Sequence, residues 1–489
     1  MKEKREPFIA KLKRTIPVML RRLRSGPNIF SIVLCIITAG VILGSRYSEG
    51  IENPFDFAGS ILLILLIYIL YLIIRRPVIF GREMNNSERY LLSSLAGSYI
   101  IGSVLLNNLS PGSEGFPVSL AVPTALFIML LAVFLGKRPA MIMALALPLG
   151  AFLAGAFDSH SYIIALVSGA AAAVLHNANP SRAQNRMSLI KAGLVIAAAN
   201  CAATVIILLI RKAAFYDFSA LLFWASLNGI ICGMLTIGFL PPLEYALNAV
   251  TPFRLMELSD LNAPILRKLF TTAPGTYSHS LMVANLAEQA CQDIGANPLL
   301  ARVGAYYHDI GKMENPSYFV ENQTDHNRHD EIAPRLSATI IRSHVKLGVE
   351  KAHSLGLPKD VISIISEHHG NSIISWFYNK ATEQTAPEGK PVTVNSEDFS
   401  YPGSPPRSKE SAIVMLADIT EAAVRTLTKP TPGKMEKFIQ QLFQAKIDHG
   451  QLSESALSFC ELEIIKKAFV RVLAGYYHSR IEYPKQEIT

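Results

Sequence analysis

Charged residues are scarce in this 489-residue chain. Asp, Glu, Lys and Arg make up 17% of it, against about 25% in a typical soluble domain, while half of the residues are apolar. This composition excludes a purely soluble protein. Cysteine is also scarce: the five cysteines show no CxxC spacing, which excludes a disulfide framework and a zinc cluster held by thiolates.

The net charge of +8 is concentrated at the N-terminus. Residues 1–25 hold nine Lys or Arg and two Glu, whereas residues 251–489 hold 25 basic and 27 acidic residues. A basic surplus is typical of a nucleic-acid partner or of an anionic membrane surface. Because the surplus lies in one short segment, we predict a basic cytoplasmic leader over residues 1–27 and no nucleic-acid partner.

The first half of the chain contains eight apolar runs without a charged residue or histidine. Most are long enough for a helix to cross a bilayer core of about 30 Å. We predict a first transmembrane helix over 28–45, a short external loop over 46–56 and a seven-helix transmembrane block over 57–240. The runs are 28–45, 57–74, 90–106, 117–135, 141–157, 162–175, 192–210 and 219–240.

Loop charge predicts the orientation of these spans. With the N-terminus in the cytoplasm, the cytoplasmic segments hold 18 Lys or Arg and the external loops hold three, as the positive-inside rule requires. We therefore expect a multi-pass protein of the cytoplasmic membrane. The spans lack the ionisable residues of most pumps, which favours an anchor or sensor; a neutral transport site at Asn200 and Asn228 is the alternative.

The second half of the chain is rich in histidine and helical in its apolar periodicity. Ten of the twelve histidines follow residue 250. We predict an amphipathic connector over 241–270 and a cytoplasmic domain over 271–489, with a helix stop at Gly295, a restart at Asn297 and a loop over 386–408. The predicted fold class is all-α: a multi-span helical membrane domain followed by an all-helical cytoplasmic domain.

Seven residues of this half are candidate metal ligands. Imidazoles mixed with carboxylates, without thiolates, favour Mn²⁺ or Fe²⁺ over structural zinc. The set is large enough for two divalent ions if the Asp309 carboxylate bridges them. A His-Asp pair alone is a weak signal, since His329-Asp330 is a second one. The candidates are His279, His308, Asp309, His344, His368, His369 and Asp418.

These residues and their surroundings resemble the HD superfamily of metal-dependent phosphohydrolases. More closely, the chain resembles the seven-transmembrane HD-domain family, the PgpH-type cyclic di-AMP phosphodiesterases. The motifs that carry this resemblance extend from about residue 241 to 484. The membrane half resembles the family only in its pattern of spans. Family members typically carry an extracytoplasmic domain where this chain has residues 46–56. The matching motifs include APGTY at 273–277, ANPLLARVGAYYHDIGK at 296–312, EHHG at 367–370 and YPG at 401–403.

The resemblance implies a two-metal phosphodiesterase that opens cyclic di-AMP to linear pApA. It implies that His279, His308, Asp309 and Asp418 hold one ion. It further implies that His344, His368 and His369 hold the other, with Asp309 shared. Lys312 would neutralise charge on the phosphate; a solvated lysine is the alternative.

Other functions remain alternatives. Cyclic di-GMP is one substrate alternative, although the Gly-Tyr-Pro motif that usually accompanies its cleavage by HD proteins is missing from the sequence. A deoxynucleotide triphosphohydrolase would need only the one-metal set. A receptor or transport-coupled protein that binds a cyclic dinucleotide without cleaving it is the alternative from another class. The oligomeric state stays open, with a homodimer as one alternative.

Overall fold

The computed structural model divides into two units, each described by itself. The N-terminal unit ends at Leu247 and the C-terminal unit begins at Asn248. The described residues contain no strand, only an isolated antiparallel bridge between Ile373 and Ser400. The predicted all-α fold is confirmed. The described residues are 29–48, 84–109, 120–175, 186–212, 215–323, 326–385, 394–428 and 430–477, with scattered positions between 58 and 69.

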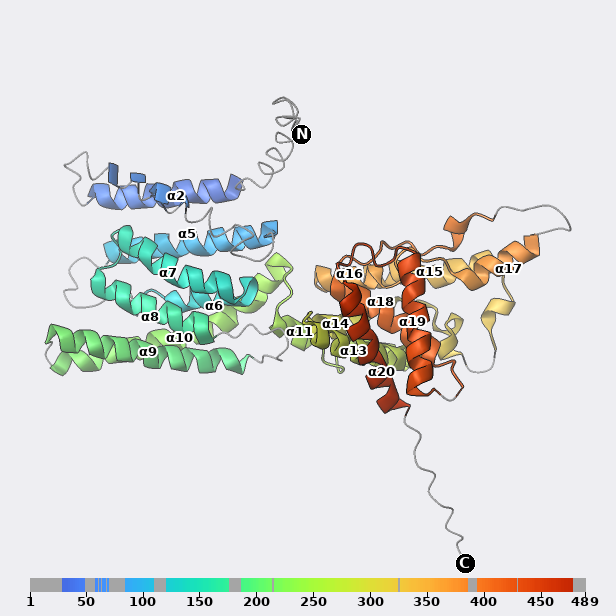
Figure 1. The fold of residues 1–489 in the computed structure, drawn as a ribbon. Helices are drawn as coiled ribbons and strands as arrows, with labels where there is room; N and C mark the ends of the chain where they lie inside the picture. The colour runs from blue at the N-terminus through green and yellow to red at the C-terminus, as the bar shows by residue number, and fades with distance from the viewer. Residues whose placement is uncertain are drawn as a thin grey trace, which may run out of the picture. The chain divides into compact units, whose positions relative to one another are not determined.

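The N-terminal unit is a set of apolar helices that lie side by side (Figure 1). Seven of the eight predicted runs contain a helix, and the run 57–74 lies largely outside the described residues. In the described part, α5, α9 and α10 are long and apolar enough to cross a membrane. The helices are α2 (Ile29–Ser48), α5 (Asn86–Leu109), α6 (Thr124–Leu135), α7 (Lys137–Leu153), α8 (Ser159–Leu175), α9 (Met187–Arg211) and α10 (Phe215–Leu247).

Helices α9 and α10 pack closely because small residues face each other. A Cβ atom added to Gly229 would lie 2.3 Å from the backbone nitrogen of Ala197, so only glycine permits this approach. Helix α10 also continues through Pro241 and Pro242 to Leu247, beyond the predicted end of the span at residue 240. A proline removes one backbone donor and favours a kink, but it does not end this helix.

Two buried asparagines support the turn that precedes α6. The side-chain amide of Asn228 donates to the carbonyl oxygens of Leu120 and Val122, at 3.0 and 3.2 Å, and the amide of Asn200 donates to Asn228 Oδ1 at 3.2 Å. Backbone carbonyls outside a helix need such partners within a membrane. The pair that the sequence offers as a neutral transport site thus holds the start of α6.

The C-terminal unit is built around α13, which packs against α14, α18 and α20. As predicted, α13 ends at Gly295, whose φ of +73° suits glycine, and the side chain of Asn297 caps α14 by accepting a hydrogen bond from the amide of Leu300. The helices are α11 (Pro252–Leu258), α12 (Pro264–Thr272), α13 (Pro274–Ile294), α14 (Pro298–Tyr307), α15 (Pro334–Ser354), α16 (Lys359–Glu367), α17 (Ser375–Thr385), α18 (Lys409–Val424), α19 (Pro432–Asp448) and α20 (Phe459–Tyr476).

A close backbone crossing joins α15 to the short 3₁₀ helix η2 (Ile310–Glu314). A Cβ atom added to Gly311 would lie 1.9 Å from the carbonyl oxygen of His344 and 2.6 Å from the backbone nitrogen of Gly348. Both contacts are far shorter than van der Waals distance. The glycine in the sequence His-Asp-Ile-Gly-Lys therefore lets Asp309 approach His344.

We predict that Gly311→Ala destabilises the C-terminal unit, because the added methyl group must push η2 away from α15. Overpacking of this kind typically costs about 1–3 kcal/mol. Thermal unfolding of the detergent-solubilised chain measures the loss. Gly433→Ala is the control, since an added Cβ there meets no atom within 4 Å; equal unfolding midpoints for the two variants would contradict the prediction.

Candidate metal centre

The structure brings all seven predicted metal ligands together in the C-terminal unit. They come from different helices and meet around the carboxylate of Asp309. His279 lies in α13, His344 in α15 and Asp418 in α18, while His308 and His368 are the residues that follow the last turns of α14 and α16. Asp309 and His369 come directly after those two helix ends.

The two oxygen atoms of Asp309 face different groups of histidines. Asp309 Oδ2 lies 3.2 Å from His308 Nε2 and 3.8 Å from His279 Nε2. Asp309 Oδ1 lies 3.3 Å from His344 Nε2 and 3.7 Å from His368 Nε2. One carboxylate therefore stands between two sets of nitrogen ligands, which is the arrangement that a bridging carboxylate needs.

Asp418 is the second carboxylate of the set and contacts three of the histidines. Its Oδ1 atom lies 3.0 Å from His279 Nε2 and 3.9 Å from His308 Nε2, and its Oδ2 atom lies 3.4 Å from His369 Nδ1. Three groups of side chains here have ligand atoms within 4.8 Å of one another and could each hold a metal ion. The groups are His344, His368 and His369; His279, His308 and Asp309; and His308, His368 and Asp418.

Backbone carbonyls orient three of the buried histidines. The Nδ1 atoms of His308, His344 and His368 lie 2.7, 2.6 and 2.8 Å from the carbonyl oxygen three residues earlier in each case. A carbonyl only accepts, so Nδ1 carries the proton. In the neutral ring the Nε2 atom is then the unprotonated nitrogen, and it points into the centre.

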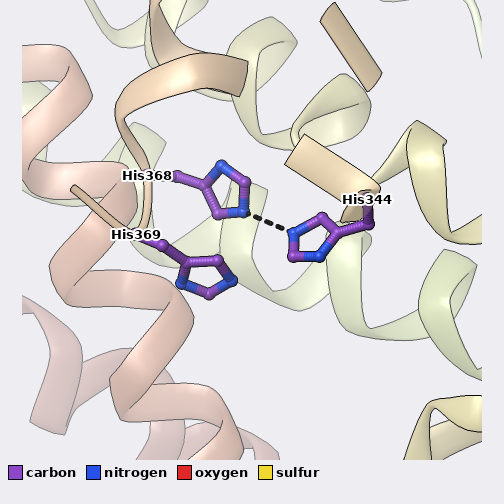
Figure 2. A group of neighbouring side chains, drawn as sticks. All are labelled: His344, His368 and His369. Atoms are coloured by element: carbon purple, nitrogen blue, oxygen red, sulfur yellow. Dashed lines mark hydrogen bonds between the residues drawn. The ribbon is translucent and has the colours of Figure 1, made fainter. Parts of the chain in front are cut away.

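Figure 2 shows the consequence for His344 and His368, whose rings point toward each other. Their Nε2 atoms are 3.2 Å apart. Two unprotonated nitrogens at this distance repel each other unless a cation lies between them. The separation suits two ligands of one ion that sits about 2.1 Å from each nitrogen.

Unsatisfied polar atoms support the same conclusion. His308 and Asp309 are buried, at 0% and 1% exposure, yet His308 Nε2 and Asp309 Oδ1 have no hydrogen-bond partner among the described residues. Buried polar groups in native proteins are almost always satisfied. The donor set therefore fits divalent metal ions.

The pKa values of these side chains match the states that metal ligands require. Burial lowers the pKa of His369 and of His344, and it lowers the pKa of His368 to about 3. Burial raises the pKa of Asp309, but the neighbouring His308 and the positive charge of Lys312 outweigh burial and hold this pKa well below its usual range. Neutral imidazoles and an ionised carboxylate are the forms that bind metal.

His279 differs from the other histidines. Burial lowers its pKa, but hydrogen bonds to Asp418 and Glu421 outweigh burial and raise the value to about 10. Without metal, this imidazole is therefore protonated at neutral pH. Metal binding at Nε2 has to displace that proton.

Lys312 is held between two carboxylates. Its Nζ atom lies 2.7 Å from Asp309 Oδ2 and 2.9 Å from Glu321 Oε1, and it sits 4.9 Å from the centre of the Phe319 ring. Its side chain is only 11% exposed, so the alternative of a solvated lysine is wrong. The predicted contact between Lys312 and a substrate phosphate stays a prediction.

A cavity of about 240 Å³ adjoins the ligands. Lys312, His344, His369 and Asp418 line it, together with Tyr401 from the loop before α18. The Tyr401 ring stacks on His369, with ring centres 4.2 Å apart. The loop predicted over 386–408 thus contributes at least this one side chain to the cavity.

Sequence reasoning assigned no role to Glu421, Glu321 and Tyr401. Glu421 had a local signal, because it follows Asp418 by three residues and so lies on the same face of α18. Tyr401 lies in the YPG motif that carries the family resemblance, but nothing in its spacing indicates a contact with His369. The spacing of Glu321 likewise does not indicate its contact with Lys312.

Comparisons with known proteins agree with this geometry. Residues 55–251 match the family model described as a 7TM receptor with intracellular HD hydrolase, and residues 276–423 match the HD domain model. The chain belongs to the seven-transmembrane HD family. The predicted resemblance is confirmed, and membership supports a membrane protein that binds divalent metal.

Several relatives cover much of this chain. The cyclic-di-AMP phosphodiesterase PgpH of Bacillus subtilis is 37% identical over 83% of this chain and 58% of its own length. The Listeria monocytogenes protein of the same name is 37% identical over 75% of this chain and 50% of its own length. The chain thus spans about half the length of the curated relatives it matches.

One solved structure is also similar to part of this chain. The HD domain of L. monocytogenes PgpH in complex with cyclic-di-AMP is 44% identical and covers 45% of this chain and 100% of its own, with a TM-score of 0.42.

We predict that Asp309→Asn removes both metal ions, because one carboxylate serves both groups of histidines. His344→Ala removes only the ion on the Oδ1 side. Elemental analysis of the purified full-length protein should give about two ions per chain for the unmodified protein, near zero for Asp309→Asn and about one for His344→Ala. His353→Ala is the control on the same helix, since His353 is exposed; retention of both ions by Asp309→Asn would contradict the bridging role.

Proposed function

We propose that this protein is a membrane-anchored phosphodiesterase that hydrolyses cyclic di-AMP to linear pApA with two divalent metal ions. The observation that carries the proposal is the position of Asp309, whose two oxygens face two separate histidine groups beside a cavity. Similarity to PgpH proteins from two organisms supports cyclic di-AMP as the substrate.

The contacts support the following ligand assignment. His279, His308 and Asp418 would hold one ion on the Oδ2 side of Asp309. His344, His368 and His369 would hold the other on the Oδ1 side. When bound, two such ions lower the pKa of a water between them and neutralise charge on a phosphodiester. We propose Mn²⁺ or Fe²⁺ as the ions, because imidazole and carboxylate ligands suit them.

The side chains that line the cavity supply only part of the positive charge that an anionic substrate would need. The cavity lining includes the carboxylates of Glu321, Asp418 and Glu421 beside the cationic side chains of Lys312 and Arg425, so it carries no large surplus of positive charge. Lys312 keeps Asp309 ionised by lying 2.7 Å from it, and its remaining capacity to donate would serve a phosphate oxygen. Tyr401 holds the His369 ring by stacking on it. In this hydrolysis the oxygen of a water molecule would form a new bond to phosphorus as the bond between phosphorus and a ribose 3′-oxygen breaks. The 3′-oxygen would take a proton, and the phosphate would stay on the 5′-oxygen of the linear product.

We predict that the purified full-length chain with Mn²⁺ converts cyclic di-AMP to pApA and that Asp309→Ala reduces turnover to background. Chromatography of the products after incubation measures both, with cyclic di-GMP assayed beside cyclic di-AMP. His353→Ala should keep full activity. Preferential cleavage of cyclic di-GMP would favour the guanine substrate, and tight binding without any turnover would favour a receptor.

We also propose that the N-terminus and the C-terminal unit lie in the cytoplasm. The support is the excess of Lys and Arg in alternate loops of the first half. A fluorescent protein that folds only in the cytoplasm, fused after Thr489, should be fluorescent. Alkaline phosphatase fused at the same place should be inactive, and the reverse pair of results would contradict this orientation.

A further inference from the structure

The imidazole of His279 has a carboxylate partner outside the seven predicted ligands. Its Nδ1 atom lies 2.5 Å from Glu421 Oε2, and Glu421 is buried at 6% exposure. The other ring nitrogen, Nε2, faces Asp309 and Asp418. An ionised carboxylate only accepts hydrogen bonds, so Nδ1 donates to Glu421 and Nε2 is the nitrogen directed at the metal centre.

This partner distinguishes His279 from the other oriented histidines. His308, His344 and His368 each donate from Nδ1 to a neutral backbone carbonyl. His279 alone among these four donates to a charged group. A hydrogen bond to an ionised acceptor is about twice as strong as one to a neutral acceptor, and it makes the imidazole a more basic ligand.

An arginine fixes the carboxylate in turn. Arg425 donates from Nη2 to Glu421 Oε1, one helix turn along α18. The two oxygens of Glu421 thus accept different hydrogen bonds: Oε2 accepts from the imidazole of His279, and Oε1 accepts from the guanidinium group of Arg425. Asp418 lies on the same face of α18, three residues before Glu421. One helix therefore supplies both a candidate ligand and the support for another.

We propose that Glu421, held by Arg425, is a positioning residue that orients His279 and strengthens its bond to the metal ion. The proposal rests on the proposed metal site. In this role Glu421 acts through the imidazole of His279 and is not itself a ligand of the ion. Loss of such an outer partner typically weakens metal binding by about 10–100-fold.

The competing explanation is that Glu421 only fills and stabilises the interior beside His279. Two variants separate these roles. Glu421→Gln retains a side-chain oxygen that accepts from Nδ1 but removes the charge, whereas Glu421→Ala removes the acceptor. A positioning role predicts graded metal affinity across the series, whereas a packing role predicts a change in the stability of the metal-free protein.

The experiment measures Mn²⁺ affinity of the full-length protein in detergent by competition with a fluorescent chelator. We expect two Mn²⁺ binding events in the unmodified protein. Glu421→Ala should weaken one of them by about 10–100-fold and leave the other unchanged. Glu421→Gln should recover most of the loss, and Arg425→Ala should cost a few-fold. Co²⁺ substitution gives a second readout, because the absorption bands of the ion report on the ligand field at His279.

Glu288→Ala is the matched control. Glu288 pairs with Arg302 at 3.1 Å in the same unit, and among the described residues it makes no hydrogen bond to an imidazole. Its loss should leave metal affinity unchanged. The proposal is overturned if the affinity of Glu421→Ala for Mn²⁺ lies within twofold of that of the unmodified protein. It is also overturned if Glu421→Ala and Glu421→Gln lose affinity equally and both have a lower unfolding midpoint without metal. Failure of the unmodified protein to bind metal at all would instead refute the proposed function.

Discussion

The buried negative charge of Asp309 is the constraint on which the C-terminal unit depends. An isolated ionised carboxylate in a protein interior costs several kcal/mol, so the surrounding elements must compensate for it. Lys312 supplies a positive charge at 2.7 Å. The Nε2 atoms of His308 and His344 approach the two oxygens from different elements, and because these nitrogens are unprotonated, a bound cation would supply the rest of the compensation. Each of these contacts fixes one element relative to Asp309. The arrangement of α14, α15 and η2 therefore follows from how one carboxylate is satisfied.

Helix ends and glycine make that arrangement possible. His308 and His368 follow the last turns of α14 and α16, where backbone carbonyls lack intrahelical partners. The same residues can therefore satisfy a helix end through Nδ1 and present Nε2 to the centre. Gly311 allows η2 to cross α15 at a distance that a side chain would prevent. Local backbone chemistry thus sets the orientation of the rings before any metal is considered.

The candidate metal ligands could be predicted from the sequence, whereas the residues that support those ligands could not. Histidines and aspartates in an apolar helical pattern are chemically distinctive, and all seven candidates meet in the structure. Gly295 and Asn297 predicted a helix end and start because their preferences are local. Glu421 was missed because its role depends on His279, 142 residues away. The continuation of α10 past Pro242 was missed because proline weakens a helix without always ending it.

The two sides of Asp309 are chemically unequal. On the Oδ2 side stand His279, backed by Glu421, and the second carboxylate Asp418. On the Oδ1 side stand His344 and His368, whose partners are neutral carbonyls. Lys312 also lies on the Oδ2 side, with its Nζ atom 2.7 Å from that oxygen. Charged partners of both signs therefore concentrate on the Oδ2 side, whereas the imidazoles on the Oδ1 side are held by neutral carbonyls. Because a hydrogen bond to a charged acceptor is about twice as strong as one to a neutral acceptor, the protein itself orders the side chains on the Oδ2 side more strongly.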